Sequence, residues 1–289
     1  MPRSYVYGKQ TFDFDREVAV MAIVNRTPDS FYDRGATYAL GAALDRVDQA
    51  LDEGARWLDV GGVKAAPGPA VDEAEELARV LPVVEAARAR TDAVLSVDTW
   101  RPGVARRVLD AGADVINDSS GLWYPELADA VAEAGAGLVV MHHVGAPRTT
   151  GDGHVYDGDL VDAVRGFLAA KVDEARRRGV APERLIVDPG HDFHKDVLHS
   201  LEITRRTAEL AGLGHPLLVA LSNKDFIGKT LDRPVDGRLE GSLAAAVFSV
   251  LAGANILRVH DVGATVRAVR MTEAILGWRQ PAVPPDRAS

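Results

Sequence analysis

Short apolar runs recur along this sequence, and nearly every one of them ends in a polar or ionisable residue. The residues at these ends are Asn25, Asp59, Asp98, Asn117, Met141 with His142, Asp188, Lys224, and Arg258 with His260. Any one of them alone has an ordinary explanation, because Asp and Asn are favoured in turns and at helix starts. The set also contains a Lys, an Arg and a His, which capping does not require. We therefore interpret the set as one binding site, in which charged groups shift one another's pKa values.

Part of this set suits a flat heterocyclic ligand. Asp98, Asn117 and Asp188 offer paired hydrogen-bond acceptors and donors for the amino and lactam edges of such a ring. Lys224 can donate to a ring carbonyl or to a ring nitrogen. Phe193, five residues beyond Asp188, could stack on an aromatic second substrate or could pack within its own loop, and the sequence favours neither role.

Another part of the set suits a diphosphate. Arg258 and His260 supply positive charge, and Asn25 supplies an oxygen ligand for the Mg²⁺ that accompanies such a group. A zinc pair at His142 and His143 is not expected, because adjacent residues of a strand point to opposite faces. The sequence also contains neither the GxSxG elbow of serine hydrolases nor the HExxH motif of metalloproteases.

The apolar runs are predicted to be buried strands, at 19–24, 57–60, 94–97, 114–116, 138–141, 185–187, 217–221 and 256–259. Helical patterns alternate with them, as in Leu40, Leu44, Val47 and Leu51 before the helix-stopping Gly54. Eight such units in about 250 residues predict an α/β fold, the (β/α)8 TIM barrel, whose strand ends meet at one face. A doubly wound open sheet is the alternative. It usually has fewer strands and often a GxGxxG motif, which is absent after the first strand.

The segments outside these units have simple predicted roles. Residues 5–15 alternate around Gly8-Lys9 and predict a short N-terminal hairpin that closes the bottom of the barrel. No Gly- or Pro-rich linker divides the chain, so a single domain is expected over residues 1–280. The polar segment 146–158 is predicted to be a mobile loop, and the Pro-rich tail 281–289 is predicted to be disordered.

Composition excludes several classes of protein. The net charge of −9 disfavours a nucleic-acid binder that relies on phosphate contacts. The absence of Cys excludes disulfides, thiolate metal sites and thiol nucleophiles. The sequence has no run of 18 apolar residues and no signal-peptide pattern, so no membrane partner is expected. A soluble cytoplasmic protein is therefore the expectation.

Several longer motifs carry a resemblance to a known family. They are IVNRTPDSF (23–31), LDVGG (58–62), LSVDTW (95–100), GADVINDSSG (112–121), VDPGHDF (187–193), LSNKDFIG (221–228) and LRVHDV (257–262). In this order the chain resembles the dihydropteroate synthases from Ala19 to about Met271. Enzymes of that family join 6-hydroxymethyl-7,8-dihydropterin diphosphate to p-aminobenzoate, and they release pyrophosphate.

The resemblance implies roles for individual residues. A pterin pocket is implied at Asp98, Asn117, Asp188 and Lys224, with Met141 against the ring face. The substrate-binding set further includes Phe193 and Ser222 beside p-aminobenzoate, together with Asp59, Lys64 and Pro67. The implied catalytic residues are Lys224, Arg258 and His260, and the implied Mg²⁺ ligand is Asn25. The resemblance also implies a homodimer formed through the later helices and suggests sulfonamides as ligands.

The chain departs from the family at one important loop. After LDVGG the usual sequence is Glu-Ser-Thr-Arg-Pro-Gly, whereas residues 63–68 here read VKAAPG. Losing one charge-assisted contact in a site costs on the order of 2–4 kcal/mol, which is roughly two to three decades in rate. Lys64 can restore a charge, but without the bidentate fork of Arg. The usual Ser-Arg-Lys after the seventh strand reads Ser222-Asn223-Lys224, and the sixth-strand loop carries His191, Asp192 and His194.

These differences resemble the divergent second branch of the family found in some actinobacteria, and they leave three functional hypotheses. The first is a working dihydropteroate synthase, favoured by the pterin-pocket residues. The second is a paralogue that binds pterin or aryl ligands with little or no synthase activity, favoured by the altered loop. The third is a pterin-dependent methyltransferase barrel, which would need neither a diphosphate site nor Mg²⁺. A purely structural role is disfavoured by the concentration of ionisable groups.

Overall fold

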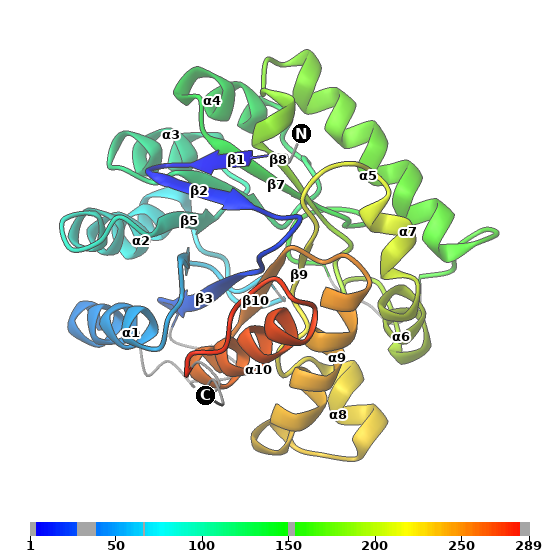
Figure 1. Cartoon of the computed structure of the whole chain (residues 1–289). Coiled ribbons are helices and arrows are strands. Elements are labelled where there is room, and N and C mark those ends of the chain that lie inside the picture. The colour runs from blue at the N-terminus through cyan, green and yellow to red at the C-terminus, as the bar shows by residue number, and fades with distance from the viewer. Residues whose placement is uncertain (1–3, 28–38, 66, 150–153, 284–289) are drawn as a thin grey trace.

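The centre of the computed structural model is a parallel sheet rolled into a barrel, and the structure describes residues 4–27, 39–65, 67–149 and 154–283. In the described chain the barrel has eight strands, in the spatial order β8-β7-β6-β5-β4-β3-β10-β9. A bridge between Val187 and Leu217 joins the two edge strands. The strands are β3 (Ala19–Asn25), β4 (Trp57–Gly61), β5 (Val94–Asp98), β6 (Val115–Asp118), β7 (Gly137–Met141), β8 (Leu185–Asp188), β9 (Leu218–Val219) and β10 (Ile256–Val259). The predicted (β/α)8 barrel is confirmed (Figure 1).

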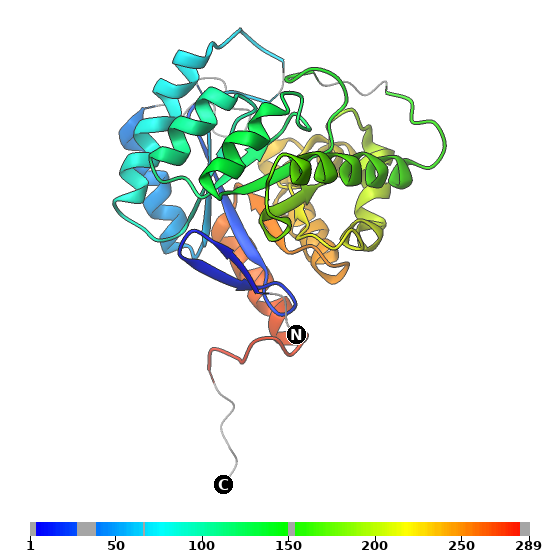
Figure 2. The ribbon, with the colours of Figure 1, turned by 90° about the horizontal axis from the view of Figure 1, so that it is seen from above.

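Helices surround this barrel on its outer side (Figures 1 and 2). They are α1 (Leu40–Asp52), α2 (Glu73–Arg88), α3 (Pro102–Asp110), α4 (Glu126–Ala134), α5 (Leu160–Arg177), α6 (Val197–Arg205), α7 (Thr207–Ala211), α8 (Asp225–Leu231), α9 (Leu239–Leu251) and α10 (Val262–Ile275). Outward-facing strand residues such as Val20, Leu58 and Leu95 pack against helix residues such as Val47 and Val84 in one large apolar cluster. Burial of this cluster is the main force that holds helices to the sheet.

The inward-facing side chains follow the two-residue period of the strands and form layers inside the barrel. The lower layer is apolar and includes Met21, Trp57, Val94 and Ile186. The inward positions two or more residues further along the strands are polar, and they include Asp59, Ser96, Asp98, Asn117, Asp188 and Arg258. The alternation that buries the core therefore also aims the polar residues at the barrel mouth.

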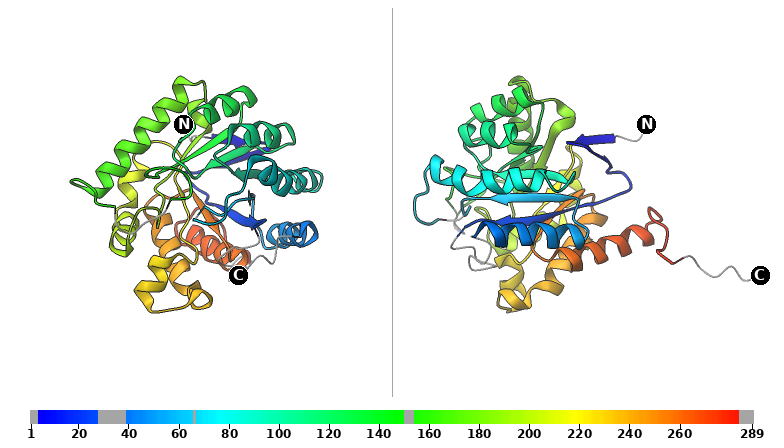
Figure 3. Two further views of the ribbon diagram at one scale, coloured as in Figure 1. Left: turned by 180° about the vertical axis from the view of Figure 1, so that it is seen from behind. Right: turned by 90° about the vertical axis from the view of Figure 1, so that its left-hand side faces the viewer.

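The N-terminal hairpin closes the bottom of the barrel, as predicted. Strands β1 (Ser4–Tyr7) and β2 (Gln10–Asp13) pair antiparallel, with Tyr5 opposite Phe12. The rings of Tyr7 and Phe12 lie with their centroids 4.9 Å and 5.6 Å from that of Trp57. Figure 3 shows the hairpin at one end of the barrel, on the same side as the C-terminal segment. The apolar end of the barrel interior is thereby sealed from water.

Two parts of the structure differ from the sequence predictions. Strand β9 spans Leu218–Val219 rather than 217–221, because the chain turns immediately afterwards: the Lys224 amide donates to the Leu221 carbonyl at 3.2 Å. Helix α8, between β9 and α9, was not predicted. It is short, and no side chain caps its N-terminus. The expectations of a mobile loop and a disordered tail fall partly on residues 150–153 and 284–289, which lie outside the described residues.

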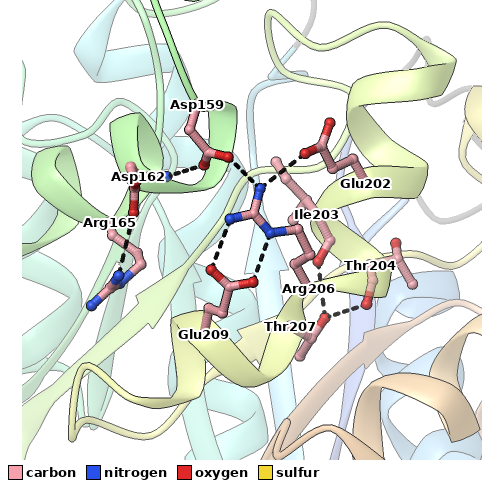
Figure 4. Close-up of polar contacts among 9 residues, drawn as sticks. All are labelled: Asp159, Asp162, Arg165, Glu202, Ile203, Thr204, Arg206, Thr207 and Glu209. Atoms are coloured by element: carbon pink, nitrogen blue, oxygen red, sulfur yellow. Dashed lines mark hydrogen bonds and ion pairs between the residues drawn. The ribbon is translucent and has the colours of Figure 1, made fainter.

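An arginine at the junction of α6 and α7 joins α5, α6 and α7 (Figure 4). The Arg206 guanidinium donates to both Glu209 oxygens at 2.6 and 2.8 Å, to Glu202 at 3.0 Å and to Asp159 at 2.6 Å. Asp159 also caps α5 by accepting from the Asp162 amide at 2.9 Å. The network therefore fixes α5 beside α6, and these two helices follow the loops that extend from β7 and β8.

No helix within the described residues is both long enough and apolar enough to cross a membrane.

Candidate active site

A cavity of about 410 Å³ lies at the C-terminal mouth of the barrel. It collects most of the residues that the sequence singled out as a binding set. The predicted site residues that line it are Asn25, Lys64, Asp98, Asn117, Met141, Asp188, Phe193, Ser222, Lys224, Arg258 and His260. The structure thus brings together side chains from strands that are far apart in the sequence.

Asp59 lies beneath this cavity rather than on its wall. Its side chain is fully buried, and it accepts hydrogen bonds from Ser96 Oγ at 2.6 Å, Asn117 Nδ2 at 3.1 Å and Arg258 Nε at 2.6 Å. A carboxylate that is enclosed by three donors does not reach the cavity, so Asp59 lies below the lining residues, and its place in the substrate-binding set stays a prediction. Its place in the structure is to orient Asn117 and Arg258, both of which do line the cavity.

Asp98 and Arg258 form the next part of the polar layer. Arg258 Nη2 lies 3.4 Å from an Asp98 oxygen, and Ser119 Oγ donates to the other oxygen at 2.9 Å. Burial raises the pKa of Asp98 to about 7, with Arg258 lowering it and Asp59 raising it further. Burial opposes the charge of Arg258, but Asp59 and Asp98 outweigh that effect and raise its pKa. Asp98 can therefore take up or release a proton near neutral pH, while the Arg258 guanidinium stays charged.

Asp188 and Lys224 also line the cavity, and their charges influence each other. Asp188 accepts from the Gly190 amide at 2.7 Å; burial raises its pKa, and Lys224 opposes this. Burial lowers the pKa of Lys224, and Asp192 and Asp188 oppose that shift. Lys224 Nζ donates to the His191 carbonyl and lies 5.0 Å from the centre of the Phe193 ring. The amine and the aromatic ring are thus held next to each other at the cavity.

His260 is held at the end of β10 by a serine and an arginine. Its amide donates to Ser222 Oγ at 3.2 Å, and its Nδ1 lies 3.2 Å from the same hydroxyl. Its carbonyl accepts from Arg46 Nη2 at 2.6 Å. Ser222 therefore serves the placement of the imidazole as well as lining the cavity.

The altered loop after β4 reaches the cavity with only part of its length. Val63, Lys64 and Ala65 line the cavity, and Ala66 lies outside the described residues. Pro67 is exposed and is not a lining residue, and its place in the substrate-binding set stays a prediction. At positions 64 and 65, the side chains that face the cavity are a lysine and a methyl group.

Lys195 and Asp192 also line the cavity, although the sequence predicted no binding role for either. Lys195 is only 2% exposed, and Asp192 adopts a left-handed backbone with φ +65°. Asp192 accepts from the Asp225 amide at 2.7 Å and from Ser200 Oγ at 3.2 Å, so it joins α8 to α6. A charged residue in a polar loop is normally solvated, and the sequence carries no signal that marks Lys195 as buried.

The donor set at the mouth fits a Mg²⁺ ion that arrives with a diphosphate better than a resident ion. The described residues contain no group of three or more His, Asp or Glu side chains that could hold a metal. Asn25 offers one amide oxygen at the end of β3, and it lies on the cavity wall. Magnesium commonly takes few protein ligands and completes its shell with water and substrate phosphates, which is compatible with this single oxygen.

The fold and the cavity together define a pterin-binding barrel, and comparison with known proteins agrees. The model of the pterin binding enzyme family matches residues 21–260. The inactive dihydropteroate synthase 2 of Mycobacterium tuberculosis is 47% identical over 91% of this chain and 84% of its own. The dihydropteroate synthase of Escherichia coli is 40% identical over 90% of this chain and 93% of its own.

Solved structures give the same result. Yersinia pestis dihydropteroate synthase, in complex with a sulfonamide drug, superposes with a TM-score of 0.90 at 38% identity, covering 95% of this chain and all of that one. The Xanthomonas albilineans enzyme with 4-aminobenzoic acid gives 0.87 at 38% identity, covering 98% of this chain and all of that one. The chain belongs to the dihydropteroate synthase family.

Proposed function

We propose that this protein is a transferase of the dihydropteroate synthase type, with a complete pterin pocket and an altered second-substrate end. It binds 6-hydroxymethyl-7,8-dihydropterin diphosphate at the barrel mouth and joins it slowly to p-aminobenzoate. One observation carries the proposal: Asp98, Asn117, Asp188 and Lys224 line one cavity, and Arg258 extends between Asp98 and the buried Asp59. That arrangement offers hydrogen-bond partners for a flat ring beside a fixed positive charge.

The chemistry assigned to these residues is mainly electrostatic. The carbon–oxygen bond to the diphosphate breaks and pyrophosphate departs with the bonding electrons, which leaves a pterin cation stabilised by resonance. The arylamine nitrogen then forms the new carbon–nitrogen bond and releases one proton to solvent. Arg258 and His260 stabilise the departing pyrophosphate, because they lie on the cavity wall with their positions fixed by Asp59 and Ser222. Asn25 would hold a Mg²⁺ ion, which would supply further positive charge at the leaving group.

The altered loop determines the expected rate. Lys64 and Ala65 occupy positions where the family carries Ser and Thr, and Ala66 replaces the Arg that closes over the diphosphate. Losing that bidentate contact costs on the order of 2–4 kcal/mol in transition-state stabilisation. Turnover is therefore proposed to lie roughly two to three decades below ordinary enzyme rates of about 1 s⁻¹ and above.

A second candidate function is pterin or aryl binding without synthesis. The same loop favours it, together with the name of the mycobacterial relative, which is called inactive. The two candidates share the pterin pocket and differ only in product formation. The methyltransferase alternative is less well supported, because a barrel of that kind has no use for a diphosphate site at Arg258 and His260.

One assay separates these candidates. The purified protein is incubated with the pterin diphosphate, p-aminobenzoate and Mg²⁺, and both dihydropteroate and pyrophosphate are quantified. Slow, stoichiometric formation of the two products supports the proposal, whereas saturable pterin binding without product supports the second candidate. A protein that binds no pterin diphosphate contradicts both. Displacement of p-aminobenzoate by a sulfonamide tests whether the aryl-binding end of the cavity resembles that of the family.

The assembly and the cellular location are also proposals. We propose a homodimer through α9 and α10, because large apolar side chains are exposed there: Phe248, Leu251, Met271 and Ile275. Such a patch on a helical face is typical of a subunit interface. Light scattering at micromolar concentration tests this, with a mass twice 30.9 kDa expected. We also propose a cytoplasmic location. We further propose that residues 1–280 fold as one unit, because one apolar cluster extends from Val20 to Val269.

A further inference from the structure

The loop between β8 and α6 is held by a buried lysine that the mechanism above does not use. Lys195 Nζ donates to the Gly190 carbonyl, to the Phe193 carbonyl and to His142 Nδ1, each at 2.9 Å. An ammonium group has three N–H donors, so all of them are taken. Lys195 therefore has no donor left for a ligand, although it lies on the cavity wall.

The loop that Lys195 contacts contains several residues with left-handed backbone conformations. Gly190 has φ +66°, and a Cβ there would lie 2.3 Å from the His142 carbonyl oxygen, so the loop crosses directly over the end of β7. Asp192 and His194 adopt left-handed backbones with φ +65° and +52°, although neither is glycine. Such conformations cost free energy and persist only where surrounding contacts enforce them. Lys195 contributes to this enforcement: its bonds to Gly190 and Phe193 tie the loop to itself, and its bond to His142 ties the loop to the residue that follows β7.

The loop carries Phe193, which lines the cavity. Its carbonyl is held by Lys195, and its ring lies 5.0 Å from the Lys224 amine. Lys224 also donates to the carbonyl of His191 in the same loop. Two buried amines therefore take the carbonyls of residues 190, 191 and 193. One of these amines faces the proposed pterin pocket, and the other sets the position of the aromatic ring.

We propose that Lys195 is a positioning residue for the second substrate: it fixes the Phe193 ring as a wall for an aryl amine without contacting that substrate. This inference rests on the proposed function, because it names the residue that shapes the aryl end of the same cavity. An aromatic wall held in one orientation lowers the entropy cost of aryl binding. Loss of Lys195 frees the loop and weakens aryl binding selectively.

The burial and the charged neighbours of Lys195 make its hydrogen bonds to the loop sensitive to pH. Burial lowers the pKa of Lys195 to about 7, Lys224 lowers it further, and Asp188 and Asp192 oppose both. The other titratable groups around it are imidazoles that burial keeps neutral: His142 and His143 beyond β7, and His191 and His194 in its own loop. Above neutral pH the Lys195 amine loses a proton and keeps two N–H donors for its three acceptors, so one hydrogen bond that holds the loop is lost. Binding of the aryl amine is therefore expected to weaken as pH rises through 7.

Two substitutions at Lys195 and a matched control test the proposal. Lys195→Met removes the hydrogen-bond donors and keeps most of the side-chain volume, whereas Lys195→Arg keeps the positive charge. The control, Lys9→Met, makes the same Lys-to-Met substitution on the exposed hairpin, where Lys9 pairs with Asp92. For Lys195→Met, the KM for p-aminobenzoate should rise at least tenfold, and the Kd for the pterin diphosphate should stay within twofold. Lys195→Arg should recover part of the loss, and Lys9→Met should match the wild type. The rise in aryl KM above pH 7 should be present in the wild type and absent in Lys195→Met.

A double-mutant cycle with Phe193→Leu adds a check that does not depend on how much Lys195→Met destabilises the fold. If Lys195 acts through Phe193, the two substitutions should not be additive: Lys195→Met should change the aryl KM less than twofold in the Phe193→Leu background. If Lys195→Met does not fold, Lys195→Arg and Phe193→Leu are combined in the same cycle.

Each result has a distinct meaning. An active wild type with an unchanged aryl KM in Lys195→Met overturns this inference and leaves the proposed function intact. Equal losses of pterin and aryl affinity also overturn it, because they indicate general damage to the barrel mouth. A wild type that binds the pterin diphosphate but no aryl amine overturns the aryl part of the proposed function together with this inference.

Discussion

Replacing the buried Asp59 by Asn should damage both stability and pterin affinity. The carboxylate accepts from Ser96, Asn117 and Arg258, and the change places an NH₂ group opposite one of these donors. Removing one member of a buried ion pair costs about 3–5 kcal/mol. The lower end applies here, because Arg258 keeps a second carboxylate at 3.4 Å and its side chain is 18% exposed.

This loss converts into two measurable effects. A cost of about 3 kcal/mol lowers Tm by roughly 6–12 °C in a domain of this size. The Asn117 amide and the Arg258 guanidinium lose their orienting partner, so the Kd for the pterin diphosphate should rise roughly ten- to a hundredfold, which is 1.4–2.8 kcal/mol. Asp59 also raises the pKa of Asp98, so that pKa should fall in the variant.

Thermal denaturation followed by circular dichroism and titration calorimetry measure the two effects. Asp92→Asn is the matched control, because Asp92 is an exposed carboxylate that pairs with Lys9 on the hairpin, away from the cavity. The control should leave the pterin Kd unchanged. An Asp59→Asn variant with wild-type Tm and a pterin Kd within twofold would refute the assignment of Asp59 as the support of the polar layer.

Further predictions concern pH, the hairpin and the altered loop. The pKa of Asp98 is raised to about 7 in the folded protein, so its neutral form stabilises the fold fully below about pH 4, and this contribution is lost as pH rises through 7. Relative to Asp98→Asn, the wild-type free energy of unfolding should fall between pH 4 and 7, by at most about 1.4 kcal/mol per pH unit in urea titrations; a flat difference contradicts the burial argument. Phe12→Ala should cost about 3–5 kcal/mol in urea unfolding, because its ring packs on Trp57, and should leave the pterin Kd unchanged. Lys64→Ala should lower kcat/KM if Lys64 supplies the missing charge, and equal values would exclude that role. Ala66→Arg should raise kcat/KM by roughly two to three decades in the same assay, and no increase would mean that the loop is not what limits the rate.

Much of the barrel could be predicted because its strands are buried on both faces. Runs such as 19–24 and 94–97 have the length and composition of central parallel strands, and no competing helical period obscures them. The predicted range of strand β9 was too long at its C-terminal end, because Ala220 and Leu221 are apolar and buried although they lie outside the hydrogen-bonded ladder. Burial alone does not show where the hydrogen bonding of a strand ends.

The site was predictable to the extent that it lies on strands. Asp98, Asn117 and Asp188 follow apolar runs directly, so the topology of a barrel brings them to one mouth. Asp59 has the same sequence signature, but its depth depends on the three donors around it, which only the structure reveals. Lys195 lies in a loop, where the path of the backbone depends on left-handed residues that no simple pattern encodes.

The most direct test of the account is calorimetric titration of the purified protein with 6-hydroxymethyl-7,8-dihydropterin diphosphate in the presence of Mg²⁺. Saturable binding of one molecule per chain is expected, weakened at least tenfold in both Asp98→Asn and Asp188→Asn, because these two carboxylates line the same cavity. No saturable binding by the wild type, or equal affinities for the wild type and both variants, would contradict it.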